Sequence, residues 1–180
     1  MFCEHEWDNC KCLKCGQLPQ NADDLVEISD KNWELGTLEE IKEALSPELF
    51  TVHVGMNIIG NFQGDGWHSI FTDQSELLPY VSDALTNLGL MEINTAFQEV
   101  LSQFPELIRD DESEVPGFLE GAGWEMTDDE LSRFSEEDRS KISAYNNLLE
   151  KLDDTSDAYF GLEAPAEGWK SILDYIRSIY

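Results

Sequence analysis

Apolar residues recur at helical spacing through most of this chain, and the clearest case is a pair of neighbouring segments. Residues 77–88 and 93–104 each carry apolar side chains three and four positions apart, and Leu-Gly separates them. Two amphipathic helices joined by so short a turn must bury their apolar stripes together. Ser75 is a predicted N-cap for the first helix, and Pro105 cannot continue the second.

The same reasoning predicts helices on either side of this pair. Residues 37–45 open with a capping box, and a second helix begins with proline in its first turn and covers residues 47–59. Two more helices are expected over residues 135–152 and after Pro165, whereas the glycine-rich residues 60–66 predict a turn. We therefore expect an all-α, multi-helix single domain with about seven or eight helices and without strands.

Composition divides the chain into three segments. Residues 1–20 contain all four cysteines and form a predicted zinc-binding segment. Residues 21–36 read as a polar linker with a short apolar patch, and residues 37–180 as an acidic helical domain. A length of 180 residues with 41% hydrophobic residues is enough for one core with a small zinc-knuckle appendage.

The N-terminal segment carries the most specific local pattern, a Cys-x-x-Cys-Gly knuckle. Two thiolates so spaced reach one cation from a tight turn, and the glycine permits a left-handed backbone. A structural zinc accepts four ligands, so one candidate is spare. Cys12 and Cys15 are the expected pair, and three residues compete for the other two positions: Cys3, His5 and Cys10.

Residues 5–16 have the order His-x-Trp-x-x-Cys-x-Cys-x-x-Cys-Gly, which is similar to short zinc-binding segments attached to phage and bacterial proteins. That resemblance implies a structural zinc ion and leaves Cys3 or Cys10 as the spare candidate. Reactive thiols or a redox sensor are the alternative reading. We favour zinc because cytosolic disulfides are uncommon, and a catalytic zinc is not expected because cysteine-rich sites are closed to water.

The charge of the chain is strongly one-sided, with 38 acidic and 11 basic residues and a formal net charge of -27. Such a charge disfavours direct contact with nucleic acid or an anionic membrane and favours a cationic partner. It also exceeds the magnitude of about 2 to 8 that solubility asks of a small domain. The chain has no apolar run near the length of a membrane span and no signal-peptide pattern, which predicts a cytoplasmic protein.

Acidic residues are densest in residues 106–138, which hold 13 acidic and 2 basic residues. Some of them open helices at Thr127 and Ser135, where the helix dipole favours carboxylates. Residues 153–157, a predicted helix connection, add to the acidic surface. Acids three or four residues apart on a helix lie about 5 to 6 Å apart, a spacing that permits imitation of DNA phosphates. The candidate partner-binding residues are Asp110, Asp111, Glu112, Glu114, Glu120, Asp128, Asp129, Glu136, Glu137, Asp153, Asp154 and Asp157.

The order of elements in the main domain resembles the bacterial DNA-mimic protein family. The resemblance rests on a glycine-rich run at 61–67, an apolar and aromatic pair at 70–71, a Leu-rich helix ending in Leu-Gly, Phe-Pro at 104–105, and Asp-Ala-Tyr-Phe-Gly-Leu at 157–162. It covers roughly residues 35 to 180. It implies an all-helical fold and an acidic dimer that occupies the DNA-binding face of a transcription factor.

We therefore predict a non-enzymatic acidic protein that imitates DNA and blocks the nucleic-acid-binding surface of a basic partner. The expected partners are a transcription factor, a nucleoid protein or, if the gene comes from a phage, a host defence nuclease. The first alternative is an immunity protein that neutralises a cognate nuclease toxin. The second is a metal-dependent hydrolase, which requires carboxylates that converge in a pocket beside a histidine.

Overall fold

The computed structural model describes residues 4–108, 116–124 and 126–180, and this part of the chain is predominantly helical. It contains eight α-helices and one two-stranded sheet, which confirms the predicted all-α class. The α-helices are α1 (Ala22–Trp33), α2 (Leu38–Ala44), α3 (Pro47–Thr72), α4 (Leu78–Asn87), α5 (Met91–Gln103), α6 (Asp128–Leu131), α7 (Glu136–Phe160) and α8 (Lys170–Ile179). The strands are β1 (Trp7–Asp8) and β2 (Lys11–Cys12), and the short 3-10 helices are η1 (Ser75–Leu77), η2 (Pro105–Leu107), η3 (Gly117–Gly121) and η4 (Pro165–Gly168).

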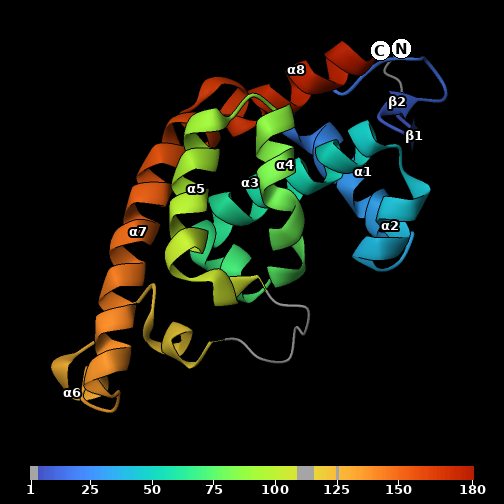
Figure 1. Ribbon diagram of the computed structural model, residues 1–180. Coiled ribbons are helices and arrows are strands. Elements are labelled where there is room, and N and C mark those ends of the chain that lie inside the picture. Colours follow the sequence, from blue (N-terminus) through green and yellow to red (C-terminus); the bar gives the residue numbers. More distant parts are fainter. Residues whose placement is uncertain (1–3, 109–115, 125) are drawn as a thin grey trace.

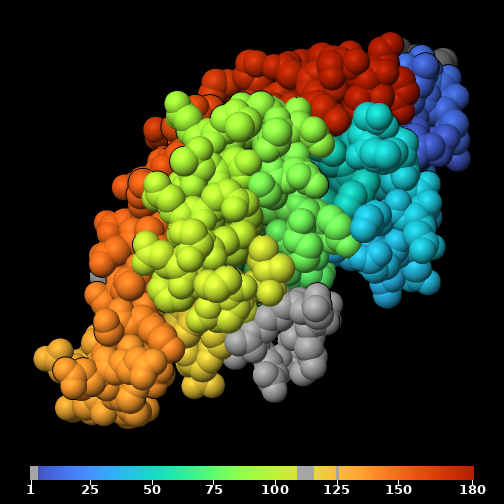
Figure 2. Space-filling model, viewed as in Figure 1, coloured from blue at the N-terminus to red at the C-terminus, as the bar shows by residue number. Residues whose placement is uncertain are grey.

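Helix α3 lies at the centre of the molecule and packs against α1, α4, α7 and α8 (Figure 1). Residues 50–59 of this helix are buried on every side, as expected for a helix surrounded by others. Helix α5 packs against α4 and α7. The long α7 continues beyond the core, and its first turns project from the body together with α6 (Figure 2).

The glycine-rich stretch 60–66 is not the predicted turn, because α3 continues through it with a single break. Asp65 and Gly66 have non-helical backbone angles, with φ of 68° and ψ of -168° at Gly66. The backbone N–H of Trp67 is thereby released, and it donates to Asp153 Oδ1 at 3.0 Å. The prediction of a helix connection at 153–157 was also wrong, because these residues belong to α7. Asp153 of α7 stabilises the break in α3 through its hydrogen bond to Trp67.

Most of the helix starts follow the sequence prediction. Thr37 and Thr127 both form complete capping boxes, and the Ser135 side chain accepts a hydrogen bond from the backbone N–H of Asp138. The antiparallel pair α4 and α5 buries the two apolar stripes that defined it. Ser75 does not act as an N-cap, because it begins the 3-10 helix η1 that precedes α4.

The segment predicted as a linker, residues 21–36, forms α1. Asn21 caps this helix by accepting from the backbone N–H of Asp24 at 3.0 Å. Leu25 and Ile28 are buried, whereas Val26 is half exposed. The prediction was wrong because two buried residues in a polar stretch give little periodicity, and contacts with α2 and α3 supply the burial.

The N-terminal segment is packed into the body. Trp7, Cys10 and Cys12 are buried in the main core, and the indole N–H of Trp7 donates to Glu27 of α1 at 3.0 Å. Lys31 of α1 donates in turn to the Trp7 carbonyl at 2.7 Å. The two short strands correct the expectation that the chain would have none. Within the described residues, no helix combines the length and the apolar character that crossing a membrane requires.

Candidate metal centre and acidic surface

A tight hairpin positions the cysteines of the N-terminal segment. β1 and β2 are antiparallel, with Trp7 opposite Cys12. The two turn residues, Asn9 and Cys10, have φ of 48° and 62°, as expected for a two-residue hairpin turn. Gly16 has φ of 73°, and its N–H donates to the Cys12 carbonyl at 2.8 Å, so the chain folds back on itself after the second strand.

Three of the predicted ligands come together at this fold. The ligand atoms of His5, Cys12 and Cys15 all lie within 4.8 Å of one another. Cys15 Sγ lies 3.7 Å from His5 Nδ1. Tetrahedral ligands bound to zinc at about 2.0 to 2.3 Å are separated by about 3.3 to 3.8 Å, so the group is close enough to hold a metal ion.

The surroundings of Cys12 favour the thiolate form that binds metals. Burial raises the pKa of this thiol, but hydrogen bonds from the backbone of Glu6 and from the His5 side chain oppose burial. Together with neighbouring backbone hydrogen bonds, they bring the pKa of Cys12 down to about 5. At neutral pH the Cys12 side chain is therefore a thiolate, the form that binds a metal cation.

Cys10 lies outside the group. Its side chain is buried, and burial raises the pKa of its thiol to about 12, so it stays protonated. This is the opposite of what a metal ligand needs. Cys3, the remaining candidate, falls outside the described residues. Cys10 and Cys15 are free thiols, so neither of them forms a disulfide.

The C-terminus of the chain supports the hairpin. The Tyr180 hydroxyl donates to the carbonyl of Asn9, and Lys11 Nζ lies 5.7 Å from the centre of the Tyr180 ring. The His5 ring stacks on Trp7 with centroids 4.8 Å apart. Figure 1 shows the C-terminal end of the chain beside the hairpin of β1 and β2.

The candidate partner-binding acids separate into three groups. Asp110, Asp111, Glu112 and Glu114 lie outside the described residues. Asp153 is half-buried and accepts the Trp67 backbone hydrogen bond, and burial raises the pKa of its carboxyl. We assign it a structural role in capping the break in α3. The remaining candidates are exposed: Glu120, Asp128, Asp129, Glu136, Glu137, Asp154 and Asp157.

Negative charge is not confined to the segment where it is densest in sequence. Residues 4–48 carry 12 acidic and 4 basic side chains, and residues 49–108 carry 7 acidic side chains and no lysine or arginine. Several of the cations elsewhere are already paired. Lys151 of α7 pairs with Glu99 of α5, and Lys141 pairs with Glu137 at 3.2 Å.

The C-terminal half of α7 carries a row of exposed acids. Glu150, Asp154 and Asp157 are separated by four and three residues, so they lie on one face of the helix. Glu150 was missing from the predicted set because it stands apart from the acidic runs in sequence, between Leu149 and Lys151. The helical spacing back from Asp154 is the signal that identifies it.

The two histidines outside the N-terminal segment, His53 and His68, lie on α3 and pack against aromatic side chains. His53 is fully buried and is hydrogen-bonded to Asn57 and Asn32, and burial lowers its pKa to about 4. His68 packs edge-on against Trp124 and Tyr145. Among the described residues, the group of His5, Cys12 and Cys15 is the only cluster that has the geometry to hold a metal ion.

Comparisons with protein-family models, with curated proteins and with solved structures give no match for this chain. The resemblance to the DNA-mimic family therefore stays a prediction. We therefore infer the function from the group formed by His5, Cys12 and Cys15 and from the surface of the protein.

Proposed function

We propose that this protein is an acidic binding protein that imitates DNA and occupies the nucleic-acid-binding surface of a basic partner protein. The observation that carries the proposal is the row of exposed carboxylates on α7, a helix held rigidly against α3 and α5. Along the helix axis, Glu150, Asp154 and Asp157 are separated by about 4.5 to 6 Å. These separations lie between one and two steps of the phosphates in a DNA strand, which rise about 3.4 Å each, so the row has a comparable density of charge without the same repeat.

The large excess of charge supports a binding role of this kind. A net charge of -27 creates a field that accelerates encounter with a cationic surface and repels nucleic acid. Binding driven by this field weakens as salt is added, because exposed charges are screened over about 10 Å at moderate ionic strength. A steep salt dependence is therefore the expected signature.

Affinity capture from host extract at low salt identifies the partner, and competition with duplex DNA then tests the mechanism. The partner should release fluorescent DNA when this protein is added. The variant Glu150→Gln, Asp154→Asn, Asp157→Asn should compete less well than the wild type. Equal competition by wild type and variant, or a ternary complex with DNA, would contradict the proposal.

A control variant separates a local effect from a change in total charge. Asp30→Asn, Glu34→Gln and Glu43→Gln remove the same number of exposed carboxylates from α1, the turn after it, and α2. If α7 makes the contact, this control should compete nearly as well as the wild type. The alternative function, an immunity protein for one nuclease, requires apolar hot spots, and it predicts a complex that survives high salt.

We further propose that His5, Cys12 and Cys15 hold a structural zinc ion and that Cys3 supplies the fourth ligand. The mixed thiolate and imidazole donors are those zinc prefers, and Cys10 is excluded by its position and its raised pKa. Elemental analysis of the full-length protein should find about one zinc per chain. Cys3→Ser, Cys12→Ser and Cys15→Ser should each lose zinc, whereas Cys10→Ser should retain it. Loss of zinc from Cys10→Ser alone would refute this ligand set.

A further inference from the structure

A cleft opens at the end of the molecule where the α4–α5 turn, the end of α7 and the start of α8 meet. Its volume is about 450 Å3, within the range of ligand pockets. Most of its lining is apolar or aromatic: Leu88, Leu90, Ala158, Tyr159, Pro165 and Tyr175. The site has the dimensions and the chemistry to accept a large hydrophobic side chain.

Exposed apolar side chains gather next to this cleft. Tyr159, which lines it, is 38% exposed, and Met91, which follows Leu90, is 55% exposed. Leu162 is 70% exposed and lies in the short turn between α7 and Pro165. Single exposed apolar residues are ordinary, but a group that surrounds an apolar cleft indicates an interaction site.

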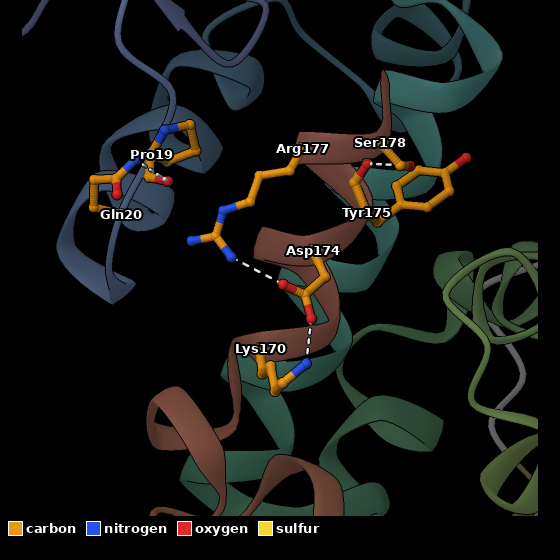
Figure 3. Close-up of polar contacts among 7 residues, drawn as sticks. All are labelled: Pro19, Gln20, Lys170, Asp174, Tyr175, Arg177 and Ser178. Atoms are coloured by element: carbon orange, nitrogen blue, oxygen red, sulfur yellow. Dashed lines mark hydrogen bonds and ion pairs between the residues drawn. The ribbon is translucent and has the colours of Figure 1, made fainter. Parts of the chain in front are cut away.

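The charges around the cleft define the occupant. Residues 152–169 contain five acidic residues and no lysine or arginine, and Glu92 accepts a hydrogen bond from the Tyr159 hydroxyl at 2.9 Å. The cation that lines the cleft, Lys170, is paired with Asp174 (Figure 3). An anionic ligand is therefore disfavoured, and so is a second copy of this chain with its own charge of -27.

The wall of the cleft is held in a fixed shape. Gln63 Nε2 donates to the carbonyls of Phe160 and Glu167 at 2.8 and 2.7 Å, and so joins the end of α7 to η4. Ala166 and Glu167 have φ of 55° and 54°, a strained conformation for residues with side chains. Such strain persists only where the surroundings impose it, so the site is formed before a partner arrives.

We propose that this cleft anchors one hydrophobic side chain of a lysine- or arginine-rich amphipathic helix on the basic partner. The inference rests on the proposed function and adds the place where the partner is held. Carboxylates around the cleft then attract the basic face of that helix, and the cleft buries its apolar face. Binding should therefore weaken steeply as salt is added, because the carboxylates supply most of the affinity, and a smaller contribution from the cleft should remain at high salt. An immunity complex would instead keep nearly all of its affinity.

Synthetic fluorescent peptides and the full-length protein test this directly. A Lys/Leu amphipathic helix should bind at low salt and retain measurable binding at high salt. A Lys/Ser peptide of equal charge should lose its binding at high salt, and a Glu/Leu peptide should not bind. Equal binding of the Glu/Leu and Lys/Leu peptides would overturn the charge argument.

Ala158→Gln places a longer polar side chain in the cleft. The position is exposed on α7, and glutamine has a high helix propensity, so the substitution should not disturb the helix. It should weaken binding of the Lys/Leu peptide roughly ten- to hundredfold, the effect of excluding one leucine. The matched control is Ala44→Gln, an exposed helical alanine on α2, on the other side of the molecule (Figure 1). Leu162→Ser tests the edge of the cleft in the same way and should weaken binding of the Lys/Leu peptide. Its control is Leu35→Ser, which removes an exposed leucine away from the cleft.

These outcomes separate the two proposals. If Ala158→Gln and Ala44→Gln bind the Lys/Leu peptide equally, the cleft is not the anchor, although competition with DNA can still succeed. If the peptide requires the cleft but the captured partner keeps its DNA, the function proposed above fails and the docking site stands. Self-association that Ala158→Gln abolishes would assign the cleft to a second copy of the chain and overturn the inference.

Discussion

Replacing Gly66 by alanine tests the break in α3, which joins the central helix to α7. The backbone angles of Gly66 fall in a region open almost only to glycine, and forcing another residue there costs about 1 to 3 kcal/mol. An alanine Cβ would also lie 3.2 Å from Asp153 Oδ1. The carboxylate must then move and weaken its bond to Trp67, so we expect a total loss of about 2 to 4 kcal/mol in the free energy of unfolding.

Gly60→Ala is the matched control in the same helix. Gly60 is exposed and has ordinary helical angles, and an added Cβ would meet the Trp169 ring at 3.9 Å, a normal contact. Alanine is favoured over glycine in a helix interior by about 1 kcal/mol. The two substitutions should therefore change stability in opposite directions.

Thermal and urea unfolding, followed by far-UV circular dichroism, measure both effects. For a protein of this size, 1 kcal/mol corresponds to about 2 to 4 °C in Tm, so Gly66→Ala should melt roughly 4 to 16 °C below the wild type. Gly60→Ala should melt slightly above it. If Gly66→Ala is as stable as the wild type, the break is not held by glycine and the account of α3 is wrong.

Three further predictions concern buried polar groups. Ser156→Ala should lower the free energy of unfolding by about 1 to 3 kcal/mol, because the Ser156 hydroxyl accepts a hydrogen bond of 2.7 Å from the buried indole N–H of Trp67. The control Ser143→Ala, on the exposed face of α7, should leave the free energy of unfolding in urea nearly unchanged. Tyr145→Phe should increase the free energy of unfolding by about 1 kcal/mol and raise Tm, because the Tyr145 hydroxyl is buried and has no hydrogen-bond partner among the described residues. A lower Tm would contradict this and indicate a partner for the hydroxyl. Burial lowers the pKa of His53 to about 4, whereas the pKa of histidine in the unfolded chain is about 6.5. Between these two pH values the unfolded chain binds more protons than the folded protein. The folded protein therefore loses stability as the pH falls from about 6.5 to about 4. His53→Gln should flatten that part of the pH profile of unfolding, and an unchanged profile would contradict the assignment.

The sequence predicted those elements whose signals are local. The stripes of α4 and α5 and the capping boxes at Thr37 and Thr127 depend on residues three or four apart, and each is present in the structure. The knuckle spacing likewise identified Cys12 and Cys15. Short-range chemistry decides these features, so neighbouring residues suffice to predict them.

The features that the sequence did not predict depend on distant contacts. α1 is polar over most of its length, and its helix is stabilised by burial of Leu25 and Ile28 against other elements. α3 continues past the glycine-rich stretch, with one break at Asp65 and Gly66, because Asp153 of α7 supports that break. Spacing could not separate Cys10 from the group formed by His5, Cys12 and Cys15, because only the left-handed backbone of the hairpin turn places Cys10 in the core.

Helix α8 runs from the cleft to the hairpin that carries Cys12 and the candidate metal ligands. Its first turns supply Lys170 and Asp174 to the cleft, and the last residue of the chain, Tyr180, is bonded to the turn of the knuckle. The helix has ten residues and is about 15 Å long, and Ile172, Leu173 and Ile176 anchor it in the core between these two contacts. A metal ion bound by His5, Cys12 and Cys15 would fix the hairpin, and through Tyr180 it would also hold the far end of the helix that forms one wall of the cleft. If both proposals hold, a zinc ion would brace the docking surface, the carboxylates on α7 would attract the partner, and the cleft would hold one of its side chains.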